Sequence, residues 1–429
     1  EAADMVKSND RVVFTPGREA HSIGLALAAR REELKAVKVF VGTPGYDFGW
    51  YDPGWQEAFE IKTLMPTATC QQAVDARLID LVSGVIIAPF EQLEDSSNAD
   101  IVLTEISSPD ESGFCSFGQS LWNKKRLIEE AKISIAEVND KLIRTFGNNR
   151  IHVEDIDYFV PHVSSGAEPS SGSLAGRQKK EPPAYIKDIC GYVSSLIPDR
   201  ATIQIGVGRT TEPLVKMGLL DGKHDIGYHS QATPPGVISL VRDGVITGKY
   251  KNINQGKCTV TSIGGDTKEE LEYVHMNPLF ELVDVGYLED IRVISAHDNF
   301  VAINSALQID LLGQVAAESI GERFIAAAGG QTPFTIGAAM SKGGKSLTVM
   351  PSTAANGTVS RIKPILDPGT PVTVPRIVTM YVVTEYGIAN LWGKSTRDKA
   401  LELIGIAHPD FRDELRREAL RRFWPCSSP

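Results

Sequence analysis

Short apolar runs alternate with helix-like stretches along the chain. The runs Arg11–Phe14 and Val37–Val41 flank an Ala/Leu-rich stretch, Ser22–Leu34, which predicts a strand, a helix and a second strand. The same alternation predicts further helices at Thr69–Leu81, Lys124–Ala131 and Pro183–Leu196, and further strands at Val85–Ala88, Lys132–Val138, Cys258–Ile263 and Arg292–Ser295. The pattern favours an α/β fold.

One segment interrupts this alternation. Residues 163–182 are rich in Ser, Gly and Pro, a composition that does not build a packed element. A chain of 429 residues is long enough for two domains of ordinary size. We therefore predict a linker at 163–182 between an N-terminal α/β domain, 1–162, and a C-terminal α/β domain, 183–429.

The stretch Ile203–Gly244 contains the clearest candidate site. An apolar run enters the turn Gly206-Val207-Gly208-Arg209-Thr210, and a second predicted strand ends in His229-Ser230-Gln231. In open α/β sheets ligands collect at the carboxyl ends of strands, so these two segments should meet there. The glycines permit close backbone approach, and helix-start amides suit phosphate or oxyanion oxygens. A tight turn without a ligand is the alternative, because the third glycine of the dinucleotide fingerprint is missing.

A second unusual segment lies between Gly42 and Trp55. Four aromatic residues gather in it at Tyr46, Phe48, Trp50 and Tyr51, with a fifth at Trp55, and Gly and Pro interrupt it throughout. Such a segment is not a regular element. It is either a surface loop held by its aromatics or the wall of a substrate pocket, and the sequence does not decide between them.

Composition narrows the function classes. The net charge is −10 and the basic residues are dispersed, which argues against nucleic acid as a partner. Five scattered cysteines show no metal-ligand spacing, so we expect no metal site, buried or incidental thiols and a reducing compartment. No apolar run reaches the ~18 residues of a membrane span, and the first residues lack signal-peptide character, so a cytoplasmic location is expected.

Several longer motifs resemble the acetyl-CoA hydrolase/transferase family, which includes 4-hydroxybutyrate, butyryl and acetate/succinate CoA-transferases. They run in order along the chain: Thr104–Gly118, Gly313–Gly321, Gly329–Gln331, Ser341–Lys345, Val383–Gly387 and Ile406–Arg412. The resemblance implies two open α/β domains of the CoA-transferase fold with the active site in the cleft between them. It also implies a cytoplasmic homodimer or higher homo-oligomer, and coenzyme A thioesters as substrates with no permanently bound cofactor.

The chemistry that the resemblance implies is covalent. A glutamate attacks the acyl-CoA carbonyl to give an anhydride, free CoA then forms a glutamyl-CoA thioester, and a second carboxylic acid collects the CoA. Backbone N–H groups must face the oxyanion of each intermediate. The resemblance assigns Gly206, Val207, Gly208, Arg209 and Thr210 to the first CoA and oxyanion loop, Gly329 and Gly330 to a second backbone contact, Asn304 to the pocket lining, and Lys342 and Lys345 to CoA phosphates. Solvated loop charges are an equal alternative for the lysines.

The chain departs from the family at the nucleophile. Where the family carries His-Ser/Thr-Glu, this sequence has His229-Ser230-Gln231, and a carboxamide cannot form the anhydride. Three explanations account for Gln231: a deliberate exchange that traps a complex, a different CoA-thioester chemistry on the same fold, or CoA binding without catalysis. The unusual Ala232–Gly236 that follows favours natural divergence.

Three functions therefore remain open. The first is an acyl-CoA:carboxylate CoA-transferase that acts through position 231. The second is a CoA-thioester hydrolase or C–C lyase in which a base such as His229 replaces the nucleophile, and the third is an inactive CoA-binding protein. Other acids are candidate substitutes for the nucleophile: Glu105, Glu212, Glu281, Glu318 and Glu385. For all of them except Glu281, which stays open, a structural role is preferred.

Overall fold

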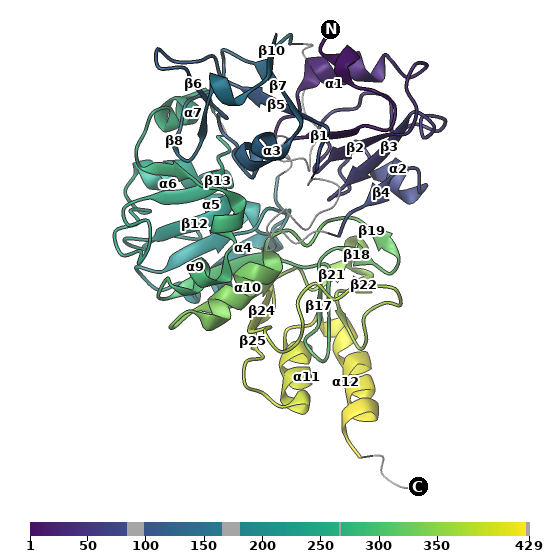
Figure 1. The fold of residues 1–429 in the computed structure, drawn as a ribbon. Helices are drawn as coiled ribbons and strands as arrows, with labels where there is room; N and C mark the ends of the chain where they lie inside the picture. Colours follow the sequence, from purple (N-terminus) through teal and green to yellow (C-terminus); the bar gives the residue numbers. More distant parts are fainter. Residues whose placement is uncertain (84–97, 165–180, 266, 426–429) are drawn as a thin grey trace. The chain divides into compact units, whose positions relative to one another are not determined.

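The computed structural model describes residues 1–83, 98–164, 181–265 and 267–425 (Figure 1). The chain forms two compact units, and each contains more than one segment of the sequence. Unit 1 comprises Glu1–Lys179, Thr259–Leu288 and Phe324–Ala327; unit 2 comprises Lys180–Cys258, Glu289–Arg323 and Ala328–Pro429. The predicted linker and the predicted strand Val85–Ala88 lie largely or wholly outside the described residues, and both remain predictions.

Unit 1 is built on a parallel sheet with the order β10-β7-β5-β1-β2-β3-β4. Its strands are β1 (Arg11–Phe14), β2 (Val37–Val41), β3 (Phe59–Thr63), β4 (Asp80–Leu81), β5 (Ile101–Ile106), β7 (Ile133–Val138) and β10 (Tyr158–Pro161). All six residues of β5 are buried, as expected for a strand covered on both faces. The helices of this unit are α1 (His21–Ala28), α2 (Gln71–Asp75), α3 (Lys124–Glu130), α7 (Lys268–Val274) and α8 (Val285–Leu288).

Unit 2 also has a mainly parallel sheet, with the order β25-β24-β20-β15-β11-β12. Its strands are β11 (Thr202–Ile205), β12 (Gly227–Ala232), β15 (Phe300–Ser305), β20 (Lys345–Val349), β24 (Tyr381–Thr384) and β25 (Gly387–Asn390), of which β25 pairs antiparallel with β24. The helices are α4 (Tyr185–Ser195), α5 (Glu212–Lys216), α6 (Val237–Arg242), α9 (Ile291–Ser295), α10 (Gln331–Met340), α11 (Thr396–Gly405) and α12 (Pro409–Phe423). Because β11, β12 and β15 run parallel, their carboxyl ends meet at one edge.

Short strands complete the two units. They are β6 (Phe114–Ser116), β8 (Phe146–Gly147), β9 (Arg150–His152), β13 (Cys258–Ser262), β14 (Phe280–Leu282), β16 (Gln308–Asp310), β17 (Val315–Ala316), β18 (Ser319–Ile320), β19 (Arg323–Phe324), β21 (Thr353–Ala354), β22 (Val359–Ser360) and β23 (Ile362–Lys363). In the described part of the chain, 3₁₀ turns lie at Ala3–Met5, Val153–Asp155 and Ala355–Gly357.

The predicted strand Arg292–Ser295 is wrong, because these residues belong to helix α9. The side chain of Asp290 accepts a hydrogen bond from the backbone N–H of Arg292 at 2.8 Å and so caps the helix. Ile291, Val293 and Ile294 are β-branched and resemble a strand in so short a run. The cap and tertiary packing outweigh that preference.

The aromatic segment after β2 packs into the core of unit 1. Trp50 is fully buried, and its ring centroid lies 4.8 Å from that of Phe48, 5.6 Å from that of Phe59 and 5.8 Å from that of Phe14. Trp55 is only partly buried. The segment is therefore an irregular loop whose inner aromatics fill the core, which favours a packing role over that of a pocket wall.

The four cysteines in the described residues, Cys70, Cys115, Cys190 and Cys258, are free and buried, as predicted for incidental thiols. Among the described helices, none is long and apolar enough to cross a membrane.

Candidate active site

The loop after β11 is held close to the end of β15. A Cβ atom added to Gly206 would lie 2.5 Å from Oδ1 of Asn304, and one added to Gly208 would lie 2.9 Å from Oγ of Ser305. The Thr211 hydroxyl closes the turn by donating to the Gly206 carbonyl at 2.5 Å. Glycine is required at both positions because the chains approach too closely for any side chain.

Asn304 is held in one orientation by a neighbouring amide. Its Nδ2 donates to Oε1 of Gln204 at 3.0 Å, and Nε2 of Gln204 donates to its Oδ1 at 2.9 Å. Both side chains are buried. The predicted glycine loop and the predicted pocket residue are therefore brought together, on adjacent parallel strands.

Gln231 lies at the same sheet edge. Ser230, the residue before it, hydrogen-bonds through Oγ to the backbone of Ile205, which immediately precedes Gly206. Gln231 is partly buried in β12, and its amide Nε2 donates a hydrogen bond to Oε1 of Glu289. The predicted position 231 and the glycine loop thus end neighbouring strands at the same edge.

Gly330 approaches this pair through its backbone. A Cβ atom added to Gly330 would lie 2.7 Å from Oε1 of Glu289 and 2.9 Å from Cδ of Gln231. Gly330 immediately precedes helix α10 and occupies its N-cap position. The structure therefore gathers Gln231, Glu289 and the N-terminal end of α10 at one place.

Glu289 was missed by the sequence analysis. It lies in no recognisable motif, and its partner Gln231 is 58 positions away in the sequence. Its side chain is fully buried, and burial raises its pKa to about 8, while the hydrogen bond from Gln231 partly opposes that rise. Within the described residues its second oxygen, Oε2, is buried and accepts no hydrogen bond.

His229 lies two residues before Gln231 on the same strand, and its side chain is fully buried. Its ring centroid is 5.1 Å from that of His297, 6.1 Å from that of Phe300 and 6.4 Å from that of Phe334. This packing suits a core residue. The role of His229 as a base remains a prediction.

The two lysines assigned to CoA phosphates lie away from the glycine loop. Lys345 begins β20 and pairs in register with Val301, near the amino end of β15, whereas Asn304 is near its carboxyl end. Its Nζ donates to the carbonyl of Leu196 at 2.8 Å. Lys342 is exposed, and its Nζ lies 3.8 Å from a carboxylate oxygen of Asp298. The structure does not bring them to the candidate site.

The remaining predicted loop residues differ in exposure. Val207 and Arg209 are exposed, and Thr210 is buried. Gly329 has a φ of +51°, a backbone conformation that glycine adopts readily, and nothing within 4 Å of an added Cβ. Among the described residues, no group of three or more His, Cys, Asp or Glu side chains is arranged to hold a metal ion.

The carboxylates that the sequence offers as substitute nucleophiles have structural positions or partners. Glu212 begins helix α5. The others accept hydrogen bonds from nearby groups: Glu105 from Asn139 at 2.8 Å, Glu281 from Thr259 at 3.4 Å, Glu318 from Thr373 at 2.7 Å, and Glu385 from the backbone and hydroxyl of Ser352 at 2.9 and 2.6 Å. These contacts favour structural roles.

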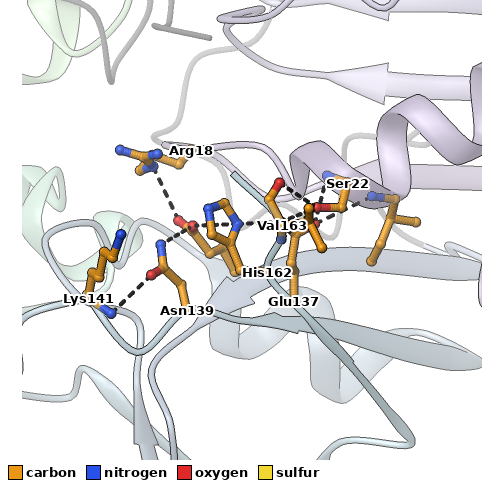
Figure 2. Close-up of polar contacts among 9 residues, drawn as sticks. Arg18, Ser22, Glu137, Asn139, Lys141, His162 and Val163 are labelled. Carbon is orange, nitrogen blue, oxygen red and sulfur yellow. Dashed lines mark hydrogen bonds and ion pairs between the residues drawn. The ribbon is translucent and has the colours of Figure 1, made fainter. Parts of the chain in front are cut away.

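A buried acid, Glu137, holds together a polar cluster in unit 1 (Figure 2). Its carboxylate accepts hydrogen bonds from the backbone N–H and hydroxyl of Ser22, both at 3.0 Å, and from the backbone N–H of Ile23 at 3.4 Å. His162 Nδ1 lies 2.5 Å from the same carboxylate. Because Ser22 and Ile23 are in the first turn of α1, Glu137 caps that helix, which explains its burial without a catalytic role.

Unit 1 also contains a cavity of about 110 Å³. Its lining includes Arg18, Glu105, Ser120 and Lys124, and Lys124 is the most deeply buried cation among them. Burial lowers the pKa of Lys124 to about 8, although the nearby Glu105 carboxylate partly opposes the shift. Unit 1 therefore contains a buried lysine that loses its proton at a lower pH than an exposed lysine does.

We expect Lys124→Met to change how stability depends on pH. The pKa of Lys124 is about 8 in the folded chain and 10.5 as its ordinary value, so between these values the unfolded chain binds more protons. The free energy of unfolding of the unchanged protein should therefore rise relative to that of the variant, by about 3 kcal/mol from pH 8 to 10.5. Urea unfolding across this range measures the difference. Lys125→Met, which replaces the neighbouring lysine, is the control, and parallel pH curves for Lys124→Met and the unchanged protein would contradict the prediction.

Comparison with known proteins agrees with the resemblance. Residues 1–165 match the acetyl-CoA hydrolase/transferase N-terminal domain, and residues 267–419 match the C-terminal domain. The 4-hydroxybutyrate coenzyme A transferase of Clostridium kluyveri is 38% identical over 99% of this chain and 96% of its own. The chain belongs to the acetyl-CoA hydrolase/transferase family.

Two solved structures show the same fold. RipA from Yersinia pestis superposes with a TM-score of 0.88 at 30% identity, over 98% of this chain and 96% of its own. A 4-hydroxybutyrate CoA-transferase from Porphyromonas gingivalis superposes with a TM-score of 0.79 at 30% identity, over 98% of this chain and 96% of its own. The α/β architecture is therefore that of the CoA-transferase fold, as the sequence predicted.

Proposed function

We propose that this protein transfers coenzyme A between an acyl-CoA and a carboxylic acid. The observation that carries the proposal is the grouping of Gln231, Glu289 and Gly330 at the carboxyl end of β12, next to the glycine loop. A carboxylate and backbone N–H groups in one place are what an anhydride and thioester mechanism needs. Two relatives named as 4-hydroxybutyrate CoA-transferases support the same reaction class.

The resemblance places the covalent glutamyl-CoA thioester at position 231, where this chain has glutamine. A carboxamide is not a nucleophile, so that form of the mechanism requires Glu at this position. The proposed reaction class needs only that some carboxylate reaches the acyl carbonyl. Acyl-CoA and the acceptor acid are the proposed substrates, and the glycine loop with Asn304 is the proposed CoA site.

The test is turnover of acetyl-CoA, butyryl-CoA and 4-hydroxybutyryl-CoA, each with and without acetate or succinate. We expect a new acyl-CoA to form only when an acceptor acid is present, detected by chromatography of the CoA species. Release of free CoA without an acceptor would instead indicate the hydrolase alternative, and cleavage within the acyl chain would indicate the lyase. Binding of CoA without any turnover would indicate the inactive protein.

A further inference from the structure

We propose that Glu289 is the carboxylate nucleophile of this protein and that Gln231 is the amide that positions it. The inference rests on the proposed CoA transfer, and it resolves how a chain with glutamine at position 231 supports that reaction. The two side chains are hydrogen-bonded to each other. The Glu289 carboxylate is therefore a direct neighbour of position 231, where the resemblance puts the nucleophile. In this chain the carboxylate of the pair is at position 289 and the amide at position 231.

The surroundings of Glu289 differ from those of Glu137, the acid that caps α1. Glu137, which is equally buried, accepts hydrogen bonds from two backbone N–H groups and a hydroxyl. Glu289 accepts a hydrogen bond from the neutral amide of Gln231, and its Oε2 has no hydrogen-bond partner among the described residues. Leaving a buried carboxylate oxygen unsatisfied is costly, and a functional role is one reason for a chain to retain such a group.

The backbone beside Glu289 suits a tetrahedral intermediate. Gly330 comes so close to the Glu289 carboxylate that a side chain there would overlap it. In the first turn of α10 the N–H of Gln331 donates to the Ala328 carbonyl at 3.3 Å, and residue 333 is a proline without an N–H, which leaves the N–H of Thr332 as the candidate donor of this turn. A developing oxyanion at the Glu289 carbonyl therefore has the N-terminal end of α10 beside it, without a charged residue.

The reaction balances with the substrates alone. An oxygen of ionised Glu289 attacks the acyl carbonyl carbon, the C–S bond breaks, and CoA leaves as the thiolate, which gives an acyl–glutamyl anhydride. The thiolate then attacks the glutamyl carbonyl and releases the first acid as its carboxylate, which leaves a Glu289–CoA thioester. The acceptor carboxylate then attacks the glutamyl carbonyl of that thioester, which gives a new anhydride and releases CoA as the thiolate. The thiolate attacks the acyl carbonyl of the new anhydride, which gives the new acyl-CoA and free Glu289. No proton, oxidant or further reactant is consumed.

Three variants test the assignment. Glu289→Gln keeps the side-chain shape and removes the only carboxylate of the pair, so acceptor-dependent transfer should fall at least about 10³-fold. The double variant Gln231→Glu/Glu289→Gln returns a carboxylate to position 231 and an amide to position 289, and it should recover transfer that Glu289→Gln lacks. Asp290→Asn, whose asparagine still caps α9, is the matched control and should keep its activity.

Chemical trapping identifies the reacting residue directly. Borohydride added with butyryl-CoA reduces a glutamyl thioester to an alcohol, so the unchanged protein should lose activity and carry the alcohol at Glu289 in peptide mass spectra. In the double variant the alcohol should appear at position 231. Label on any other residue, or full transfer by Glu289→Gln, overturns the assignment while leaving the proposed reaction intact. Absence of acceptor-dependent transfer by the unchanged protein overturns both.

The pH profile supplies an independent readout. Only ionised Glu289 attacks, and its pKa is raised to about 8, so kcat/KM should increase with pH and level off above about 8. In the double variant the carboxylate sits at the partly exposed position 231, and the rising limb should move to lower pH. If both proteins gave the same profile of kcat/KM against pH, the result would count against Glu289. The pKa of an acid with only a structural role would not determine where kcat/KM rises.

Discussion

Replacing Gly330 with alanine should lower kcat for CoA transfer by about 10²-fold, since displacing a reacting group by about 1 Å has an effect of that size. The added methyl group would lie 2.7 Å from Oε1 of Glu289 and 2.9 Å from Cδ of Gln231, closer than real Cβ contacts come. The two side chains are hydrogen-bonded to each other, so at least one of them has to move to make room for the methyl group. The carboxylate would then no longer be aligned with its acyl target.

Steady-state kinetics with a saturating acceptor measure the loss for Gly330→Ala. The control is Gly191→Ala in helix α4, where nothing lies within 4 Å of an added Cβ. Alanine inside a helix is favoured over glycine, so this variant should fold at least as well as the unchanged protein and keep its kcat. A Gly330→Ala protein with unchanged kcat would show that the backbone at this point is not part of the reacting geometry.

Much of the fold was predictable because local pattern and tertiary structure agree. The strands Arg11–Phe14 and Val37–Val41 occur with the predicted bounds, since their apolar runs end in glycine-bearing turns. The predicted helix Ser22–Leu34 begins at His21 and already ends at Ala28. Helix ends depend on caps and packing, which an Ala/Leu-rich run does not specify.

The site was only half predictable. The glycine loop carries its own signature, a Gly-x-Gly turn after an apolar run, so the sequence located it. Glu289 carries no such signature, because its significance arises only when the fold brings it against Gln231 and leaves one of its oxygens buried and unsatisfied. The lysines differ from the glycine loop in this respect: Lys345 begins β20 opposite the amino end of β15, and Lys342 lies beside Asp298, so the sequence pattern alone did not indicate where they lie.

Trp50→Ala should lower the free energy of unfolding by about 3–5 kcal/mol, the range for removing a buried aromatic side chain. Trp50 is fully buried and contacts aromatic rings from two strands and from its own loop, so truncation leaves a cavity in the core of unit 1. Chemical denaturation followed by circular dichroism measures the change. Acyl-CoA preference should not change, because the ring fills the core of unit 1.

Trp55→Ala is the matched comparison within the same loop. Its ring is partly buried, stacks on that of Phe59 and lies 4.6 Å from the guanidinium carbon of Arg31. We therefore expect Trp55→Ala to lower the free energy of unfolding by less than Trp50→Ala does. Equal losses would mean that the loop is stabilised as a whole and that Trp50 does not anchor it. A change in acyl preference with either variant, at unchanged stability, would return the loop to the role of a pocket wall.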